Sequence, residues 1–385
     1  MGNWKTCTIA DLGMVVGGAT PSTKEAENYD GGTIAWITPK DLAGYSGRFI
    51  SHGERDITEI GLHSCSAQMM PRHSVLFSSR APIGYVAIAE NELCTNQGFK
   101  SIVPNENTDY MFLYYLLLNN RQRIEHMGSG TTFKEVSGKT MRSIEVRVPE
   151  SKEEQIRISS ILSTIDDKIE ENERINKNLS DQLQALYSSE FDPMMYPVTG
   201  KLSDICHYSS ERVNVDQLTT KTYYSTENMQ PNKASAVEAA NLPNIKQTTK
   251  CHAGDVLVSN IRPYFKKIEY VTTACGCSAD VLCFVPESNE LSAFLYETVY
   301  GDRFFDYMVA GSKGTKMPRG DKQQIMQYGI VMPSPEQLSA FNAIATPMLA
   351  LIGNQVLENE RLSTLRDSLL PKLVSGEIDV SGIEL

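Results

Sequence analysis

The chain has 385 residues, of which 41% are hydrophobic and 22% are charged, and its formal net charge is −11. At roughly 150 residues per domain this length predicts two or three domains, and the composition is that of an ordinary globular protein. No run approaches the about 18 apolar residues of a membrane span, the first residues lack the pattern of a secretory signal, and eight cysteines are too few for a disulfide scaffold. These features exclude membrane, secreted and fibrous proteins and predict a protein of the reducing cytoplasm.

The negative charge argues against a protein that coats nucleic acid, because neutralising phosphates requires Lys and Arg. The charge is unevenly distributed, however. Residues 150–190 carry ten acidic and five basic side chains, whereas residues 311–322 carry four basic side chains and one acidic. Acidity is concentrated in one segment and basicity in loops elsewhere, so local contacts with nucleic acid remain open.

Residues 1–149 have the pattern of a mixed α/β domain. Strand-like runs occur at Thr33–Ile37, Ser74–Phe77 and Gly84–Ala89, separated by Gly, Pro and Asn. The segment Tyr110–Ile124 is rich in Tyr and Leu and predicts a helix. We interpret its aromatic side chains as core, since aromatics at helical spacing are more often buried than used to stack on bases.

A helical region follows at residues 150–192. Ser151 and Glu154 have the S-x-x-E spacing of a capping box at a helix start. Thr164 is a suitable cap for a second segment, so we expect a short helix followed by a longer one. Pro193 is expected to end the longer helix.

Residues 193–333 repeat the mixed pattern, with strand-like runs at Asp255–Val258 and Val281–Val285 and one expected helix at Leu291–Met308. This second half has its own turn residues between the runs. We therefore expect a second mixed α/β domain.

The last region, residues 334–385, again begins like a helix. Ser334 and Gln337 repeat the capping pattern, with Pro335 at the first helical position. Pro347 is expected to break or kink this helix, and Pro371 to end it. Each half is thus predicted to finish in a short helix and a longer one.

The two halves also resemble each other directly. TIADLG, VLFSSRAPIGYVAI and HMGSGTTFKEVSGKTM in the first half correspond to KLSDIC, VLVSNIRPYFKKI and VAGSKGTKMPRGDKQQI in the second. Each half then passes through a short apolar strand, IEVRVP or YGIVMP, into its helical region. Four matches in the same order indicate an internal duplication.

Both longer helical segments carry a stripe with alternating spacings of four and three residues, which is typical of one helix packing along another. Matched polar residues in the middle of such a seam fix register and partner. At 1.5 Å per residue the segments are roughly 40 and 36 Å long, close to the ~34–36 Å of one DNA turn. An antiparallel pair would hold two similar domains about one turn apart; two unrelated surface helices are the alternative. The predicted helix-pairing residues are Ile165, Ile169, Asn172, Asn176, Leu179, Leu186, Met348, Ile352, Gln355, Asn359, Leu362 and Leu369.

Polar and cationic loops follow the strands in both halves. Asn and Gln can bind adenine through two hydrogen bonds, and Arg or Lys can bind guanine. Small residues, hydroxyls and Lys, as in GSGTTFKEVSGK, are typical of a phosphate clamp. Each residue alone is equally consistent with a solvated loop, but recurrence in both halves favours DNA contact. The candidate DNA-binding residues are Ser79, Arg80, Asn96, Gln97, Lys100, Lys134, Lys139, Asn260, Arg262, Lys266, Lys267, Lys313, Lys316 and Arg319.

No catalytic constellation is found in the sequence. It lacks a phosphate-binding G-x-x-x-x-G-K-[ST] loop, a G-x-S-x-G elbow, an H-E-x-x-H helix and the Asn/Asp-Pro-Pro-aromatic tetrapeptide of adenine methyltransferases. Cys251, His252, Cys275, Cys277 and Cys283 form the one metal-like cluster, but their spacing does not match structural zinc sites. We interpret these cysteines as small buried side chains, and predict neither catalytic residues nor a metal.

The sequence resembles the specificity subunit of type I restriction–modification systems. The resemblance is carried by TIAWITPKDL, DITEIGLHSCSA, VLFSSRAPIGYVAIA, TNQGFKSIVPNE, GSGTTFKEVSGK, EEQIRISSILSTIDDKIEENERIN and NERLSTLRDSLLPKLVSGEI. It covers about Asp11 to Ile378 and implies an α+β protein. Residues 1–149 and 193–333 would be target-recognition domains, and residues 150–192 and 334–385 conserved helical regions that form an antiparallel coiled coil with pseudo-twofold symmetry.

The resemblance further implies a non-catalytic subunit. Each domain would read one half of an interrupted double-stranded DNA target, and the helices would set the gap and dock two methyltransferase subunits. Those subunits use S-adenosylmethionine, so no cofactor is expected in this chain, and restriction subunits would join them. Because Ser259-Asn260-Ile261-Arg262 replaces Ser78-Ser79-Arg80-Ala81 in the second half, we expect different half-sites and an asymmetric target.

The sequence leaves two alternative functions. A stand-alone DNA-modifying or DNA-cutting enzyme would bind or turn over S-adenosylmethionine as a purified chain. A structural coiled-coil scaffold would bind no duplex, even with the methyltransferase present.

Overall fold

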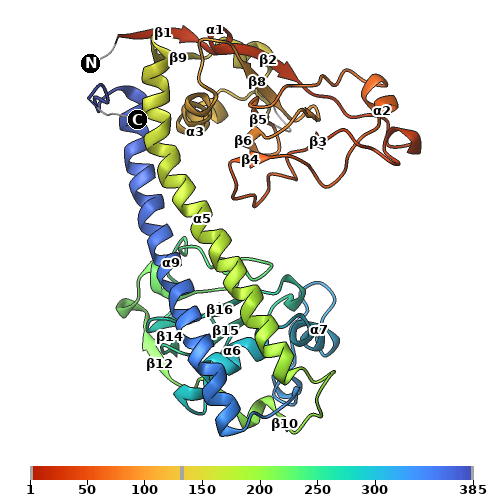
Figure 1. Cartoon of the computed structure of the whole chain (residues 1–385), viewed down its shortest axis with the longest axis vertical. Coiled ribbons are helices and arrows are strands. Elements are labelled where there is room, and N and C mark those ends of the chain that lie inside the picture. Colours follow the sequence, from red (N-terminus) through yellow and green to blue (C-terminus); the bar gives the residue numbers. More distant parts are fainter. Residues whose placement is uncertain (1–2, 131–133, 383–385) are drawn as a thin grey trace. The chain divides into compact units, whose positions relative to one another are not determined.

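The computed structural model describes residues 3–130 and 134–382 and divides into two compact units (Figure 1). Unit 1 comprises Met1–Glu170 and Glu360–Leu385, and unit 2 comprises Glu171–Asn359. Both long helices, α5 (Lys152–Phe191) and α9 (Pro335–Ser375), contribute one part to each unit.

Unit 1 is built on a five-stranded sheet in the order β2-β8-β5-β6-β4, antiparallel except for the parallel β4–β6 pair. Two small sheets, antiparallel β1-β9 and parallel β3-β7, accompany it. The strands are β1 (Trp4–Thr8), β2 (Gly13–Gly17), β3 (Trp36–Ile37), β4 (Phe49–Ile50), β5 (Val75–Ser79), β6 (Ile83–Ala89), β7 (Cys94–Thr95), β8 (Lys100–Pro104) and β9 (Glu145–Pro149). The shorter helices are α1 (Ile9–Leu12), α2 (Glu59–His63), α3 (Tyr110–His126) and α4 (Gly138–Arg142).

The central strand β5 of unit 1 is buried on both faces. Phe77 belongs to one hydrophobic cluster together with Phe112 of α3, Leu162 of α5 and Leu373 of α9. Its neighbour Leu76 belongs to a different cluster, because successive side chains of a strand point to opposite faces. The two helix segments of unit 1 thus share a core with the main sheet.

Unit 2 contains two four-stranded sheets, β11-β18-β15-β16 and β12-β14-β17-β13, and an antiparallel pair, β10-β19. All neighbours in these sheets are antiparallel except β13 and β17. The strands are β10 (Gly200–Lys201), β11 (Cys206–Tyr208), β12 (Arg212–Asn214), β13 (Tyr223–Tyr224), β14 (Gln247–Cys251), β15 (Val256–Ser259), β16 (Ile268–Tyr270), β17 (Cys275–Cys277), β18 (Val281–Pro286) and β19 (Gly329–Ile330). The shorter helices are α6 (Ser292–Tyr300), α7 (Asp302–Ala310) and α8 (Lys322–Ile325).

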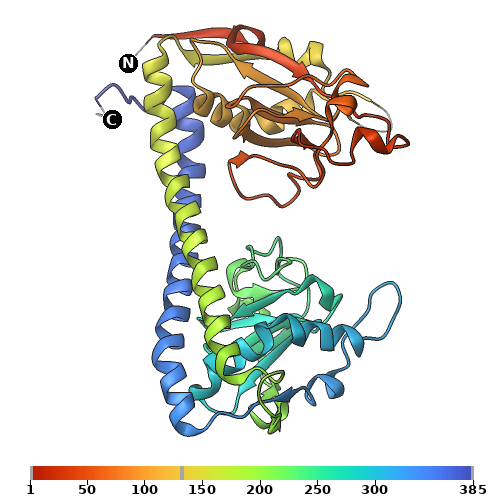
Figure 2. The ribbon, with the colours of Figure 1, turned by 45° about the vertical axis from the view of Figure 1, so that its right-hand side comes forward.

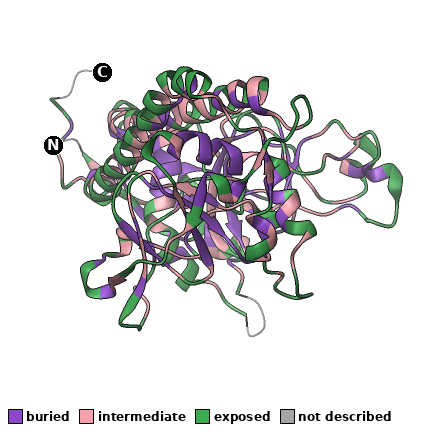
Figure 3. Ribbon diagram, turned by 90° about the horizontal axis from the view of Figure 1, so that it is seen from below, coloured by how far each residue is buried: buried purple, intermediate pink, exposed green. Residues whose placement is uncertain are grey.

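An aromatic core joins the helices of unit 2 to its first sheet. Tyr187 and Phe191 of α5 pack around Phe294 of α6 and Phe341 of α9, with ring centroids 5.1–6.3 Å apart. Val258 and Phe284 of the sheet belong to the same cluster. Buried residues, purple in Figure 3, accordingly lie on the strands and on the inner sides of the helices.

The predicted helix starts are confirmed, but the predicted break in the first helical region is wrong. Glu154 N donates to Ser151 Oγ at 3.1 Å, and Ser334 exchanges hydrogen bonds with Gln337 at 3.0 and 3.2 Å. Instead of capping a second helix, Thr164 donates from Oγ1 to the carbonyl oxygen of Ser160 inside α5. The helix α5 continues without interruption to Phe191 and ends before Pro193, as expected.

The prolines of α9 do not interrupt it either, contrary to the prediction. Pro347 and Pro371 both lie inside the helix Pro335–Ser375, and both are exposed. Each removes a hydrogen bond to the carbonyl four residues earlier, but Ala343 and Asp367 are also exposed, so those carbonyls lie on the solvent side of the helix. Burial of the opposite face then outweighs the lost bond.

Other predicted elements agree in place but differ in extent. The helix expected at Leu291–Met308 is two helices, α6 and α7, because Gly301 has an extended backbone with ψ of 142°. The strand expected at Thr33–Ile37 is reduced to β3. The strand expected in YGIVMP is likewise reduced to β19, whereas the other five predicted strands and α3 lie where the sequence placed them.

By length and composition alone, α9 could cross a membrane, although the sequence suggested no such segment. One helix of this kind is weak support for a membrane span. Phe341, Ala345 and Leu349 of α9 are buried in the core of unit 2, which explains its apolar composition by packing.

Candidate nucleic-acid interface

In unit 1 three segments meet at the end of β5. Ser79 N donates to the carbonyl oxygen of Gly98 at 2.7 Å, and Val136 N donates to the carbonyl oxygen of Ser79 at 2.9 Å. Ser129 and Glu135 exchange backbone hydrogen bonds at 3.1 and 3.0 Å, which closes the base of the loop between α3 and α4. The end of β5 therefore holds two loops in fixed register.

Unit 2 has the same backbone arrangement at the corresponding residues. Asn260 N donates to the carbonyl oxygen of Asp280 at 2.9 Å, and Gly320 N donates to the carbonyl oxygen of Asn260 at 3.2 Å. Lys313 and Arg319 exchange backbone hydrogen bonds at 2.9 and 3.0 Å. These bonds close the base of the loop between α7 and α8, whose ribbon is blue in Figure 2. The internal duplication inferred from the sequence thus extends to individual hydrogen bonds.

The cations at this place in unit 1 surround a carboxylate. Glu135 Oε1 lies 3.3 Å from Lys100 Nζ, and its Oε2 lies 3.7 Å from an Arg80 guanidinium nitrogen. Glu135 was not singled out from the sequence, although it stands directly beside the candidate Lys134. Both cations are therefore paired with the same carboxylate.

The amides of unit 1 have different roles. Asn96 Oδ1 accepts from Gly98 N at 2.8 Å and so stabilises the turn before β8. Gln97 is exposed, and its Oε1 accepts a hydrogen bond from Thr20 Oγ1. Lys134 and Lys139 are exposed. Residues 131–133 of the predicted phosphate clamp lie outside the described residues.

The prediction that Ser79 contacts DNA is wrong. Its side chain is fully buried, and Oγ donates to the carbonyl oxygen of Gly98 at 3.1 Å. This hydroxyl fixes the loop junction and cannot reach DNA in this structure. Its counterpart Asn260 is also mostly buried, although its Oδ1 has no hydrogen-bond partner in the described part of the chain.

The cations of unit 2 gather around a short 3₁₀ turn, η5 (Pro263–Phe265). Arg262 and Lys266 flank this turn, and both have left-handed backbones, with φ of 50° and 51°. Lys266 Nζ lies 3.1 Å from an oxygen of Asp302. Lys267 Nζ donates to the carbonyl oxygen of Thr226 at 2.6 Å.

The loop between α7 and α8 supplies three more cations. Lys313 Nζ lies 2.6 Å from Asp321 Oδ2, and an Arg319 guanidinium nitrogen lies 3.1 Å from Asp280 Oδ1. Lys316 is exposed at the tip of the loop. The pairing lowers the pKa of the Asp321 carboxyl, first through its hydrogen bond with Lys313. The Ile261–Arg319 bridge places the loop between α7 and α8 beside the segment that leads into η5.

The predicted helix-pairing residues are all buried or half-buried. In unit 2, Asn172 of α5 lies beside Gln355 and Asn359 of α9, whereas Tyr187 lies against Phe341. The helices therefore run antiparallel within this unit. The apolar members in unit 2 are half-buried: Leu179, Leu186, Met348 and Ile352. Those in unit 1 are half-buried as well: Ile165, Ile169, Leu362 and Leu369. Asn176 is half-buried with its Oδ1 unpartnered among the described residues.

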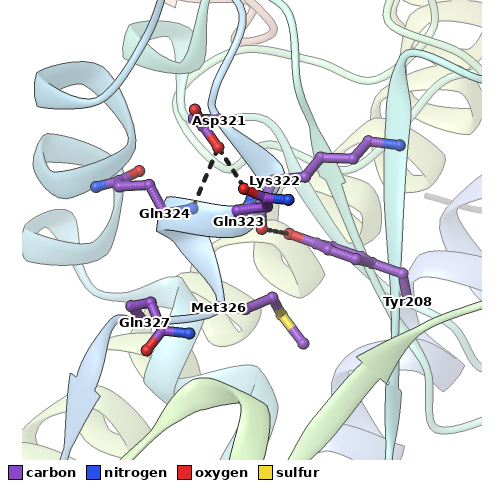
Figure 4. A pocket seen from close by; sticks show the side chains of 7 residues that line it. All are labelled: Tyr208, Asp321, Lys322, Gln323, Gln324, Met326 and Gln327. Atoms are coloured by element: carbon purple, nitrogen blue, oxygen red, sulfur yellow. Dashed lines mark hydrogen bonds between the residues drawn. The ribbon is translucent and has the colours of Figure 1, made fainter.

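Unit 2 also contains a pocket and a group of cysteines, and we assign no binding site to either. A pocket in unit 2 is lined by Tyr208 and by residues around α8 (Figure 4), where the Asp321 carboxylate caps the helix by accepting from Gln323 N and Gln324 N. Cys251, Cys275, Cys277 and Cys283 are buried in one hydrophobic cluster. Among the described residues no group of three or more His, Cys, Asp or Glu side chains is arranged to hold a metal ion.

Comparisons with known proteins agree on one family. The model of the type I restriction modification DNA specificity domain matches residues 1–180. The type I restriction enzyme MjaIX specificity subunit of Methanocaldococcus jannaschii is 32% identical over 408 aligned residues, which cover 98% of this chain and 94% of that protein. The EcoR124I/EcoR124II specificity subunit of Escherichia coli is 29% identical over 170 residues, covering 42% of this chain and 40% of that protein.

The fold is also that of a solved protein. The crystal structure of the type I restriction–modification S subunit from M. genitalium aligns with a TM-score of 0.58, at 16% identity, over 97% of this chain and 96% of that one. At this identity the likeness concerns the fold alone.

Proposed function

Because this chain belongs to the family of type I restriction enzyme specificity subunits, we propose that it reads an asymmetric, bipartite DNA target, with unit 1 reading one half and unit 2 the other. The proposal rests on one observation: the same pair of loops is held at Ser79 in unit 1 and at Asn260 in unit 2. Ser79 and Asn260 anchor the same pair of backbone hydrogen bonds in their own units. Since the loops held there differ in sequence, two related readers would recognise two different half-sites.

The side chains at the two junctions divide by chemistry. The exposed cations Lys134 and Lys316 suit phosphate contacts, which fix position on the duplex, whereas Gln97 and Arg262 suit base edges, which carry sequence information. The acidic partners of Arg80, Lys100, Lys313 and Arg319 compete with phosphates for these cations. Competition of this kind weakens non-specific binding by the free chain.

The chain acts as the non-catalytic DNA-recognition subunit of a complex with methyltransferase and restriction subunits. S-adenosylmethionine would be bound by the methyltransferase, so the purified chain alone would neither bind nor turn it over. This expectation separates the proposal from a stand-alone DNA-modifying enzyme.

The helices would dock the methyltransferase subunits, of which we propose two. Ile344 and Leu351 of α9 are 49% and 44% exposed, and their spacing of seven residues places them on one face of the helix. Exposed apolar side chains on a helix whose opposite face is already packed suit a protein partner better than DNA.

The test is a duplex titration. With its net charge of −11, the isolated chain should bind DNA weakly, and addition of the methyltransferase subunit should give tight binding to duplexes that contain the target. Tight binding of any duplex by the chain alone, or none by the complex, would reject the proposal; the latter result would favour a structural scaffold.

A further inference from the structure

Two aromatic side chains stand exposed in the middle of the cationic surface of unit 2. Tyr264 is 49% exposed and Phe265 is 38% exposed, and their ring centroids are 4.8 Å apart. Both lie on η5, directly between Arg262 and Lys266. Aromatic rings of this size are normally buried, because each removes a large apolar area from water.

The turn that presents these rings is held rigidly. Arg262 N donates to the carbonyl oxygen of Pro318 at 2.8 Å, Asn232 N donates to that of Phe265 at 2.8 Å, and Lys233 N donates to that of Lys266 at 2.9 Å. The rings are therefore exposed on a fixed support. A rigid aromatic loses little conformational entropy on binding.

The backbone of this turn is strained, which indicates that the exposure is maintained at a cost. Arg262 and Lys266 adopt left-handed conformations, which are strained for residues other than glycine. In addition, Arg262 Nε and Asn260 Oδ1 are buried atoms without a hydrogen-bond partner in the described part of the chain. Unsatisfied polar atoms beside exposed rings indicate an incomplete site.

The surroundings of the rings select the partner. Lys316 and Arg319 are exposed on the loop that is joined to this turn, with Arg319 paired with Asp280, and Lys266 beside the rings is paired with Asp302. A polyanion can replace these carboxylates as the partner of the cations. Aromatic rings among cations are typical of proteins that stack on nucleic-acid bases or insert a side chain between base pairs. The corresponding turn of unit 1, Arg80–Gly84, contains Ala, Pro and Ile and no aromatic.

We propose that Tyr264 and Phe265 stack against bases of the DNA half-site read by unit 2 and unstack one base step there. The inference depends on the proposed function and adds to it a difference between the two readers: unit 2 would deform its half-site, and unit 1 would not. Unstacking exposes base edges that Arg262 can then contact.

The experiment uses the complex with the methyltransferase subunit and a duplex carrying the target that this complex methylates. Adenines of each half-site are replaced in turn by 2-aminopurine, whose fluorescence rises when it is unstacked. The variants are Tyr264→Ala with Phe265→Ala, Tyr264→Phe, which keeps the ring, and Tyr45→Ala, which removes a 43% exposed aromatic from unit 1.

The wild type should give increased fluorescence at one or two adjacent positions of one half-site only. The double alanine variant should lose this signal and bind the target about tenfold more weakly, while Tyr264→Phe and Tyr45→Ala retain both. Thermal melting with unchanged midpoint would verify that the alanine variant folds, as expected for exposed side chains.

Three results would overturn the inference. Target binding by the wild type without any fluorescence change, or an unchanged signal in the double alanine variant, would show that these rings do not unstack bases. Failure of that variant to assemble with the methyltransferase would assign the rings to a protein contact. If the wild-type complex binds no duplex at all, the proposed function fails with it, and that outcome is distinguishable from the others.

Discussion

Asn172 of α5 donates from Nδ2 to Oδ1 of Asn359 on α9 at 2.8 Å, and the side chain of Asn172 is fully buried. The same amide donates to Glu358 at 2.7 Å, and its Oδ1 accepts from Gln355 Nε2 at 3.5 Å. A buried amide with three polar partners is satisfied only when the two helices are in this register. The interaction therefore contributes specificity to the pairing of the helices.

Replacing Asn172 by Ala should destabilise unit 2 by about 1–3 kcal/mol, because it removes the hydrogen bonds between this fully buried amide and the half-buried Gln355 and Asn359. Asn178→Ala, at an exposed position of the same helix, is the matched control and should change stability by less than about 0.5 kcal/mol. Urea denaturation followed by circular dichroism measures both. Equal stability of the Asn172 variant and the wild type would mean that this amide does not hold the helices in register.

Arg48 connects the sheet of unit 1 to α5. Its side chain is 5% exposed; Nε lies 2.8 Å from Glu170 Oε1, and it also pairs with Asp167. Arg48→Ala should destabilise unit 1 by on the order of 1–3 kcal/mol, less than for a fully buried pair because Glu170 is partly exposed. A double-mutant cycle with Glu170→Gln isolates the interaction; a coupling energy near zero would contradict this role.

The same pair predicts a dependence on pH. Although burial opposes ionisation of Glu170, hydrogen bonds from Arg48 lower the pKa of its carboxyl below the ordinary value of 4.5. A depressed folded-state pKa gives stability that is present above about pH 4.5 and is lost as the pH falls through the folded-state value. Glu170→Gln should remove this part of the acid sensitivity, and acid titrations that coincide for both proteins would refute it.

Glu297 of α6 has the opposite dependence. Burial raises the pKa of its carboxyl from 4.5 to about 8, and its Oε2 lies 3.4 Å from Gln184 Nε2. The folded state therefore binds a proton that the unfolded state releases, so stability falls as the pH rises from about 4.5 to 8. Glu297→Gln, which is neutral at every pH, should stabilise unit 2 by about 1–3 kcal/mol at pH 8. An unfolding free energy that varies with pH equally in both proteins would exclude this assignment.

Lys316 should contact phosphate without regard to sequence. In the complex, Lys316→Ala should weaken binding to target and non-target duplexes by a similar factor and lower the salt slope of the binding constant by about one. Arg262→Ala should instead reduce discrimination between them. Fluorescence anisotropy at several salt concentrations measures both effects. An unchanged slope for Lys316→Ala would remove this lysine from the interface.

Sequence patterns located the starts of the long helices and several central strands, because periodicity and caps are local. Ser151, Ser334 and the strand VLFSS have signals within a few residues of the elements they define. The uninterrupted course of α9 through Pro347 was not predictable in that way, since it depends on burial of the opposite helix face by residues distant in the chain. The division of the expected helix at Gly301 is likewise decided by tertiary packing.

The candidate interface was only partly accessible to sequence reasoning. Loop composition identified cations such as Lys316, but it could not distinguish Ser79, whose hydroxyl is buried in the loop junction, from an exposed serine. Nor could it show that Glu135 lies between Arg80 and Lys100. Side-chain direction and long-range pairing determine these roles, and neither has a local signature.

The central claim is that unit 1 and unit 2 each recognise one half of the DNA target. The most direct test is the methylation pattern of DNA treated with the complex of this chain and its methyltransferase subunit. We predict two specific half-sites separated by a gap of fixed length. Arg262→Ala should then relax one half-site and leave the other unchanged, while Gln97→Ala should affect only the other. A continuous, uninterrupted target, or variants that alter both half-sites together, would contradict a duplicated reader.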